Sequence, residues 1–475
     1  MLFTSIIFFL FLTATLLAYY LVPVKFRNYF LIAVSAFFYI YAGPVYFLLL
    51  AGLILSNYLI GLKLDLSVEE KARKGYLVLG ISINLGTLIF FKYWNFLGAN
   101  LVKLLSVFHL GFNFPYSDIL LPLGLSYYIF QFIGYLVDIY WKHEKAERDF
   151  PRFSLFILFF PKILVGPIER AGNLLPQLAK NIYFENDNIV EGGKRIAWGL
   201  FKKLVVADRI AMYQTAVMST LDQQSGITIL FATLLYSFQV YADFSGYTDI
   251  AIGVARLFGY NLIENFKRPF LAKNMGDFWR RWHISLSSWV NDYVFTPIAF
   301  KKRSWGILGV FYSLTLSFLI IGFWHGSTWN YLLFGLLQAV ALMYEYATRK
   351  FRKKLARSVP TVIYNNLSIL IMFLYVSFCL IIFRTDSFSS AGSIIKAIYT
   401  HPGGLFYDTP STLFFILIGC MIMMLYDIQK ESKIFRFNLF SNKNWIVQQV
   451  SYALLLIYIM LAGVFDGGQF IYLAF

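Results

Sequence analysis

Two of the five histidines in this 475-residue sequence, His325 and His283, are the side chains best suited to chemistry, because the other three lie in short polar connections. His325 stands in the motif GFWHG at 322–326, inside a hairpin expected over 306–346. Histidine titrates near neutral pH and is the commonest general base. The glycines on either side clear backbone volume through which a long substrate could reach the imidazole. They also form a small-xxx-small pair, so the alternative is a helix-packing motif whose histidine bonds a backbone carbonyl.

His283 stands in DFWRRWHISLS at 277–287, and it is the second candidate. Interpreted as one helix, this segment places Trp279 on an apolar face, Arg281 on the opposite face and His283 at the edge. One interpretation is an interfacial helix with tryptophans in the belt and arginines at lipid headgroups. The other is a histidine turned inward, where it would orient a substrate or a catalytic group.

Asp243 is the third candidate, because it is a carboxylate directly after an apolar run. An ionisable residue at membrane depth is costly and therefore indicates function. The alternative is a helix cap between two expected spans, 227–240 and 247–258, since Asp and Ser are common at that position.

Several known catalytic motifs are absent from the sequence. It has no G-x-S-x-G elbow, no P-loop, no dinucleotide-binding G-x-G-x-x-G and no H-E-x-x-H. Five scattered histidines form no metal-ligand pattern, so we expect no metal site. Cys379 and Cys420 lie in apolar runs and are expected to be buried free thiols.

The elements that must position these residues are membrane helices. Hydrophobic residues make up 59% of the chain and charged residues only 14%, against about 25% charged in an ordinary soluble domain. The expected fold is an all-α polytopic membrane protein with roughly 10–13 membrane segments, some short or re-entrant. The expected segments are 2–22, 29–41, 45–62, 76–91, 118–141, 153–166, 227–240, 247–258, 306–323, 329–346, 363–383, 413–425 and 445–464.

The net charge of +16 is distributed in short basic clusters between these segments. Clusters of this kind are typical of cytoplasmic loops, so we expect them inside, the N-terminus outside and no nucleic-acid partner. The polar stretch 181–203 predicts an amphipathic helix at the cytoplasmic surface. Without repeats or low-complexity linkers, residues 1–475 are expected to form one integral domain. The clusters lie at 71–74, 142–152, 301–303 and 349–357.

Taken together, these motifs resemble the membrane-bound O-acyltransferase family, in its bacterial branch that contains alginate O-acetyltransferases. The resemblance covers nearly the whole chain, and DFWRRWHISLS followed by GFWHG is its most specific part. One departure is the segment 296–301 (TPIAFK), where alginate enzymes usually carry a turn like Gly-Gly-Asn-Arg. The other matching segments are 1–12, 122–140 (PLGLSYYIFQFIGYLVDIY), 160–170 (FPKILVGPIER), 239–246, 264–270 (ENFKRPF) and 470–472.

The resemblance implies His325 as the family's buried histidine and His283 as its second characteristic one. It also implies a central tunnel, and Asp243, Trp279, Arg280 and Trp324 are the candidates for lining it or supporting the histidines. The implied donor is a cytoplasmic thioester, with acetyl-CoA expected and no bound cofactor. The implied partners are the lipid bilayer, an extracytoplasmic acyl-accepting protein of the SGNH type and a cell-envelope polysaccharide.

We therefore expect an O-acetyltransferase in the bacterial cytoplasmic membrane. An alternative within the family is D-alanyl transfer to teichoic acid from a carrier protein. A polysaccharide exporter is the alternative from another class, but transporters often carry inverted repeats and paired broken helices, and the sequence has neither.

Overall fold

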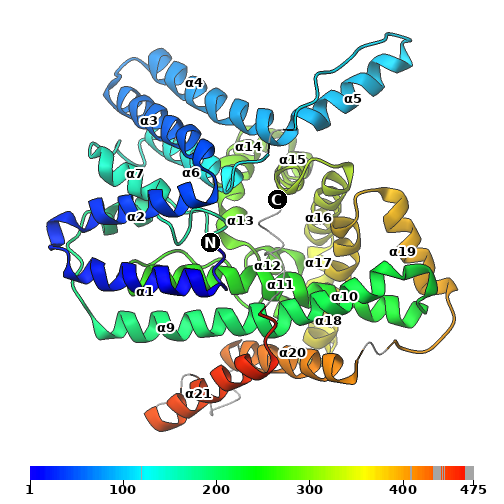
Figure 1. Ribbon diagram of the computed structural model, residues 1–475. Helices are drawn as coiled ribbons and strands as arrows, with labels where there is room; N and C mark the ends of the chain where they lie inside the picture. The colour runs from blue at the N-terminus through cyan, green and yellow to red at the C-terminus, as the bar shows by residue number, and fades with distance from the viewer. Residues whose placement is uncertain (119, 407–408, 432–439, 441, 443, 466–475) are drawn as a thin grey trace. The chain divides into compact units, whose positions relative to one another are not determined.

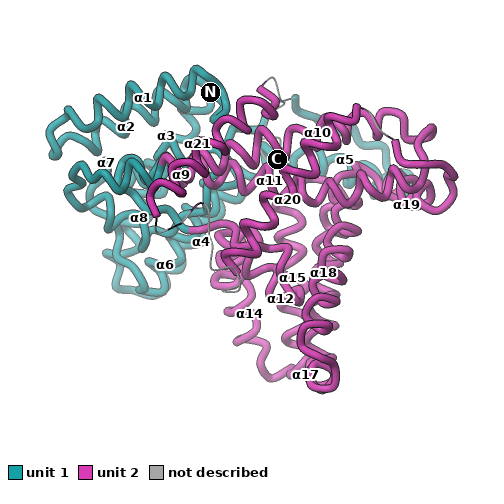
Figure 2. Tube along the Cα trace, turned by 90° about the horizontal axis from the view of Figure 1, so that it is seen from below, with its two compact units in different colours: residues 1–192, 254–263 teal, residues 193–253, 264–475 magenta. Residues whose placement is uncertain are grey.

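The computed structural model describes residues 1–118, 120–406, 409–431, 440, 442 and 444–465 (Figure 1). All regular structure in those ranges is helical, which confirms the predicted all-α class. The chain divides into two compact units (Figure 2). Unit 1 holds residues 1–192 and 254–263, and unit 2 holds residues 193–253 and 264–475. The expectation of a single integral domain stays a prediction.

Unit 1 begins with a series of helices in which α3, α4 and α6 pack against one another and α2 packs on α7. Gly80 on α4 makes one of these contacts close, since a Cβ there would lie 2.4 Å from Leu136 Cδ1 on α6. The helices are α1 (Ile6–Leu21), α2 (Arg27–Ala42), α3 (Pro44–Leu66), α4 (Glu70–Leu88), α5 (Trp94–Val107), α6 (Leu125–Tyr140), α7 (Phe150–Leu158), α8 (Ala171–Leu178) and the first part of α9 (Asn186–Leu200).

Unit 2 contains both candidate histidines, and its most extensive helix pair is the α15–α16 hairpin. Its helices are α10 (Asp208–Ser219), most of α11 (Gly226–Leu257), α12 (Met275–Trp279), α13 (Ile284–Val290), α14 (Thr296–Lys301), α15 (Ile307–His325), α16 (Trp329–Ala347), α17 (Arg349–Ser358), α18 (Thr361–Arg384), α19 (Phe388–Thr400), α20 (Pro410–Glu431) and α21 (Trp445–Ala462).

Within the residues that the structure describes, seven helical stretches are long and apolar enough to cross a membrane. Other expected segments are shorter: α1 has 16 residues, and the 16-residue α6 is buried along almost its whole length. The uneven segments expected from the sequence therefore comprise full-length spans together with shorter helices, of which α6 is enclosed by protein. The seven stretches are Pro44–Leu66, Glu70–Val107, Gly226–Leu257, Ile307–His325, Thr361–Arg384, Pro410–Glu431 and Trp445–Ala462.

The predicted re-entrant segment 153–166 is broken as expected. Helix α7 ends at Leu158, before Pro161, and the backbone from there to α8 is irregular. Every residue from Phe159 to Glu169 is buried, as irregular backbone at membrane depth requires.

Two expectations about helix boundaries are wrong. The spans expected at 227–240 and 247–258 form the single 32-residue helix α11. Gly246 does not break it, because this glycine serves close packing: a Cβ there would lie 2.9 Å from the carbonyl oxygen of Gly199. The surface helix expected at 181–203 corresponds to α9, but its final residues belong to a buried π-helical turn (Phe201–Ala207), and Lys202 and Lys203 are inside the protein.

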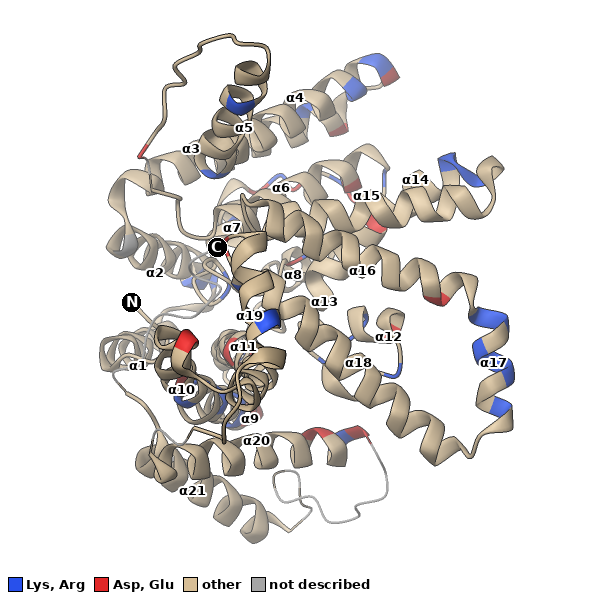
Figure 3. Cartoon of the chain, turned by 90° about the vertical axis from the view of Figure 1, so that its right-hand side faces the viewer, with Lys and Arg blue, Asp and Glu red and all other residues tan. Residues whose placement is uncertain are grey.

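Basic residues gather on α17, the short helix that connects α16 to α18 (Figure 3). Its sequence RKFRKKLARS has no buried residue, and it lies in the basic cluster expected at 349–357. An exposed basic helix that directly follows an apolar hairpin is typical of the cytoplasmic membrane surface.

Candidate functional site

His325 is the last residue of α15, and it is enclosed by aromatic rings. Only 2% of its surface is exposed. Its ring centroid lies 5.0 Å from that of Trp324, 5.1 Å from that of Phe383 and 6.2 Å from that of Phe334. The imidazole therefore sits in a largely apolar, water-poor environment, in which proton transfer and electrostatic effects are strengthened.

The glycines of the GFWHG motif pack helices together. A Cβ on Gly322 would lie 2.3 Å from the carbonyl oxygen of Tyr331, and one on Gly326 would lie 2.1 Å from the Tyr331 ring. A Cβ on Gly335 of α16 would lie 2.2 Å from the carbonyl oxygen of Phe318 on α15. The volume that these glycines leave open is thus filled by the partner helix, as the helix-packing alternative predicted.

His283 occupies a break between two short helices, which corrects the interpretation of 277–287 as one helix. Helix α12 ends at Trp279, and α13 begins at Ile284 with His283 as its N-cap residue. His283 has φ 45° and ψ 52°, a left-handed conformation that non-glycine residues rarely adopt. Its exposed fraction is 0%. Strained backbone of this kind persists where surrounding contacts determine it, and it is concentrated at functional sites.

Asn265 supplies those contacts. Its Oδ1 accepts hydrogen bonds from the backbone N of Ser285 at 3.1 Å and from the Ser285 hydroxyl at 2.9 Å. His283 Nδ1 lies 3.1 Å from the same oxygen. Because a backbone N–H can only donate, this atom of Asn265 is the oxygen, and His283 Nδ1 must donate to it. The neutral ring then carries its lone pair on Nε2.

Burial lowers the pKa of His283 well below its ordinary value, and the nearby His325 acts in the same direction. The imidazole is therefore neutral at physiological pH. A neutral ring with a fixed tautomer can accept a proton or a hydrogen bond at one defined nitrogen.

Trp324 connects the two histidines. Its ring centroid lies 5.5 Å from that of His283 and 5.0 Å from that of His325. Trp324 is itself 4% exposed, and Phe244 of α11 covers His283 edge-on at 4.7 Å. The structure thus brings together three of the six residues selected from the sequence.

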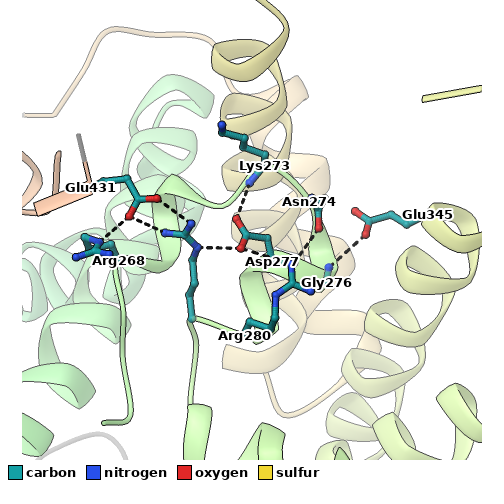
Figure 4. A network of polar contacts seen from close by, with 9 residues as sticks. Arg268, Lys273, Asn274, Gly276, Asp277, Arg280, Glu345 and Glu431 are labelled. Atoms are coloured by element: carbon teal, nitrogen blue, oxygen red, sulfur yellow. Dashed lines mark hydrogen bonds and ion pairs between the residues drawn. The ribbon is translucent and has the colours of Figure 1, made fainter. Parts of the chain in front are cut away.

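Trp279 and Arg280 lie on the same segment but have different surroundings. Trp279 is buried and packs edge-on against Phe318 of α15 at 5.1 Å. Its Nε1 donor has no hydrogen-bond partner within the described part of the chain. The Arg280 side chain is 71% exposed and lies 3.6 Å from Asp277 in a polar network around α12 (Figure 4). Among the described residues, Arg280 makes no hydrogen bond, ion pair or ring contact with a histidine.

Asp243 belongs to a separate, buried ionic cluster. It lies in the middle of α11, so the helix-cap alternative is wrong, and its carboxylate pairs with Lys203 Nζ at 2.7 Å. Lys203 also pairs with Asp208 at 2.8 Å, and burial raises the pKa of that carboxyl to about 6. Its neighbour on α11, Phe244, is the residue that covers His283.

Sequence reasoning missed Asn265 and Lys203 as members of these clusters. Asn265 lies in the ENFKRPF motif, which the resemblance singled out without giving it a role. Lys203 was assigned to a surface helix, although the adjacent apolar run LVVA could have indicated burial.

The arrangement places two imidazoles in a buried, aromatic environment. Among the described residues, no three His, Cys, Asp or Glu side chains come together as a metal site would require. Histidines in such a place can activate a hydroxyl or protonate a leaving group without a protein nucleophile.

Comparison with known proteins agrees with this chemistry. The family model described as MBOAT, the membrane-bound O-acyltransferase family, matches residues 142–385. A probable alginate O-acetylase of Pseudomonas putida is 36% identical over 349 residues, covering 73% of this chain and 71% of the relative. A peptidoglycan O-acetyltransferase of Helicobacter pylori is 33% identical, covering 83% of this chain and 78% of the relative.

A third relative is a teichoic acid D-alanyltransferase of Bacillus subtilis. It is 30% identical over 334 residues, which cover 68% of this chain and 81% of the relative. The range that the family model matches contains both histidines and Trp324. The seven apolar stretches of the described residues are typical of a multi-pass membrane protein. The chain therefore belongs to the membrane-bound O-acyltransferase family, and it is a multi-pass membrane O-acyltransferase.

Proposed function

We propose that the protein transfers an acetyl group from a cytoplasmic thioester, acetyl-CoA, across the bacterial cytoplasmic membrane for O-acetylation of a cell-envelope or extracellular polysaccharide. The observation that carries this proposal is the pair of buried histidines on either side of Trp324. Relatives named for acetylation of alginate and of peptidoglycan support the acetyl group. In this proposal an extracytoplasmic acyl-accepting protein of the SGNH type receives the group and passes it to the polymer.

The transfer can be written with His325 as general base. His325 takes the proton from the acceptor hydroxyl as its oxygen attacks the thioester carbonyl, giving a tetrahedral intermediate. The carbon–sulfur bond then breaks, and the thiolate leaves with the proton that His325 returns. The products are an O-acetyl ester and a free thiol. The buried site must exclude water, because water would hydrolyse the thioester in a competing reaction.

His283 has a supporting role in this scheme. Its Nδ1–H is committed to Asn265, so Nε2 is the nitrogen that can accept a hydrogen bond from the hydroxyl or from the departing thiol. Trp324 holds the two rings at a fixed spacing. Trp279 and Asp243 support the surrounding helices in this proposal.

The test is a reconstitution with radiolabelled acetyl-CoA. Purified protein in nanodiscs is expected to release CoA only when a hydroxyl acceptor or the partner protein is present. His325→Gln is expected to abolish release while leaving the amount of folded protein unchanged, because it removes the base and keeps most of the side-chain volume. His143→Gln is the control, since this histidine is exposed. Normal CoA release by His325→Gln would remove His325 from the mechanism.

The second candidate is D-alanyl transfer, which the teichoic acid D-alanyltransferase relative favours. The same reconstitution distinguishes the two donors. Consumption of a D-alanyl thioester on a carrier protein, with acetyl-CoA left intact, would replace the acetyl proposal by the D-alanyl one.

A further inference from the structure

A pocket of about 590 Å³ opens beside α17 in unit 2. Four cationic side chains and one carboxylate contribute to its lining. The cationic residues come from two places in the sequence, since Arg280 follows α12 and the others belong to α17. These five residues are Arg280, Glu345, Arg349, Arg352 and Lys353.

The single carboxylate does not neutralise the pocket. Glu345 accepts hydrogen bonds from the backbone N of Met275 at 2.5 Å and of Gly276 at 3.2 Å (Figure 4). It also lies 3.6 Å from Arg352. Its charge is thus largely engaged by α12 and Arg352, and the other cations give the pocket a positive potential that attracts anions.

Much of the remaining lining is apolar. It includes Phe295, Val310 and Leu314 of α15, and Leu342 of α16. A simple anion such as free phosphate would leave these side chains unused. A lining that combines cations with apolar side chains fits a ligand that carries a phosphate group at the end of an apolar or extended chain.

We propose that this pocket binds the phosphate group of such an amphiphilic ligand, with Arg349 and Lys353 as its principal phosphate contacts and the chain along α15. Guanidinium and ammonium groups are the side chains that recognise phosphate best. Two sources carry this chemistry: an anionic phospholipid of the adjacent leaflet, and the phosphopantetheine arm of a thioester donor.

The second source rests on the proposed function, and its length argues against it. Arg349 follows Phe334, whose ring lies beside that of His325, by fifteen residues, about 22 Å at 1.5 Å per residue. A phosphopantetheine arm has about as many backbone bonds as four extended residues and spans roughly 14 Å. A phosphate held by Arg349 and Lys353 would therefore leave the thioester short of His325. A basic pocket next to spanning helices is a known type of phospholipid headgroup site, so the phospholipid is the expected occupant.

The test compares two double variants of α17. Arg349→Gln with Lys353→Gln removes two lining cations, whereas Lys350→Gln with Lys354→Gln removes two exposed cations from the same helix that do not line the pocket. Full-length protein in detergent micelles is titrated with dioctanoyl phosphatidylglycerol, with the phosphatidylcholine equivalent, and with desulfo-coenzyme A. The pocket variant is expected to raise the Kd for phosphatidylglycerol about tenfold, and the control variant less than twofold.

Each outcome has a distinct meaning. Selective loss of phosphatidylglycerol binding assigns the pocket to lipid, and selective loss of desulfo-coenzyme A binding assigns it to the donor arm. Equal weakening by both variants, or no weakening by the pocket variant, would overturn the proposal. Acetyl transfer is measured in parallel for wild type and for both variants. Transfer by wild type supports the proposed enzymatic function whatever the binding result for the pocket, so the two proposals can fail separately.

Discussion

Asn265 Oδ1 and His283 Nδ1 lie 3.1 Å apart, and this contact assigns different roles to the two ring nitrogens of a fully buried histidine. The same oxygen also holds the backbone and the hydroxyl of Ser285. One asparagine thereby fixes both the left-handed backbone at the start of α13 and the tautomer of the ring. We infer that Asn265 is a positioning residue for His283.

Replacement of Asn265 should therefore impair transfer without removing either histidine. Asn265→Ala is expected to lower kcat for acetyl transfer by about tenfold or more, the scale found when a partner that orients an imidazole is lost. Asn265→Asp keeps an acceptor and adds a negative charge, which stabilises imidazolium. It should retain more activity than Asn265→Ala and shift the acidic limb of the pH–rate profile to higher pH.

Ser285→Ala is the control for this prediction, because it removes one donor to Asn265 and keeps the contact with His283. Its kcat should stay within a few-fold of wild type. Wild-type kinetics in Asn265→Ala, or an unchanged pH profile in Asn265→Asp, would contradict the positioning role.

The lowered pKa of His283 predicts a pH dependence of stability. The unfolded chain protonates this residue below about pH 6.5, whereas the folded chain keeps it neutral to a much lower pH. The contribution of His283 to the free energy of unfolding is therefore fully present above pH 6.5. Each pH unit below that value lowers the free energy of unfolding by about 1.4 kcal/mol.

Thermal unfolding of detergent-solubilised protein between pH 7.5 and 5.5 measures this effect. His283→Asn preserves a donor toward Asn265 and cannot titrate, so its Tm should depend less on pH than that of the wild type. The raised pKa of Asp208 acts in the opposite direction, but it is common to both proteins and cancels in the difference. Parallel Tm curves for the two proteins would argue against a neutral buried His283.

The sequence predicted the helical membrane fold and selected both histidines, because hydropathy and motif identity are local properties. It did not predict the break at His283, since Trp282-His283-Ile284 contains neither glycine nor proline. The break depends on hydrogen bonds that the backbone N–H groups of Ile284 and Ser285 donate to the distant Asn265. The sequence also did not predict that α11 continues through Asp243. The helix can continue there because the charge of Asp243 is paired with Lys203, 40 residues away. Tertiary contacts decided both positions.

Removal of Lys203 should be strongly destabilising. Lys203 is 2% exposed and pairs with two carboxylates, Asp208 and Asp243, so Lys203→Met removes the positive charge shared by both. Loss of one partner of a buried ion pair typically lowers the free energy of unfolding by roughly 3–5 kcal/mol. The measurement is the Tm and yield of purified protein. Addition of Asp243→Asn should recover part of the loss, and a double variant less stable than Lys203→Met would contradict this pairing.

The α15–α16 contact should tolerate no added methyl group. Gly335→Ala would place Cβ 2.2 Å from the Phe318 carbonyl oxygen, so the helices must separate, at a cost of about 1–3 kcal/mol. Because His325 ends α15, acetyl transfer should fall with the Tm. Gly86→Ala on α4 is the control, since its Cβ meets no atom within 4 Å and alanine favours helix. Equal Tm values for the two variants would refute the close packing.

The final prediction concerns orientation in the membrane. Basic clusters near span ends predict that the regions around residues 74, 145 and 354 face the cytoplasm, with the N-terminus outside. The native thiols give little background, because Cys379 is 0% and Cys420 is 9% exposed. In intact cells, Lys74→Cys, Lys145→Cys and Lys354→Cys should therefore resist an impermeant thiol reagent, whereas Thr4→Cys should react. All three lysine variants should label once the cells are permeabilised, which confirms that the new thiols are accessible. Labelling of Lys354→Cys before permeabilisation would place α17 outside, and a pocket there could not receive a cytoplasmic thioester.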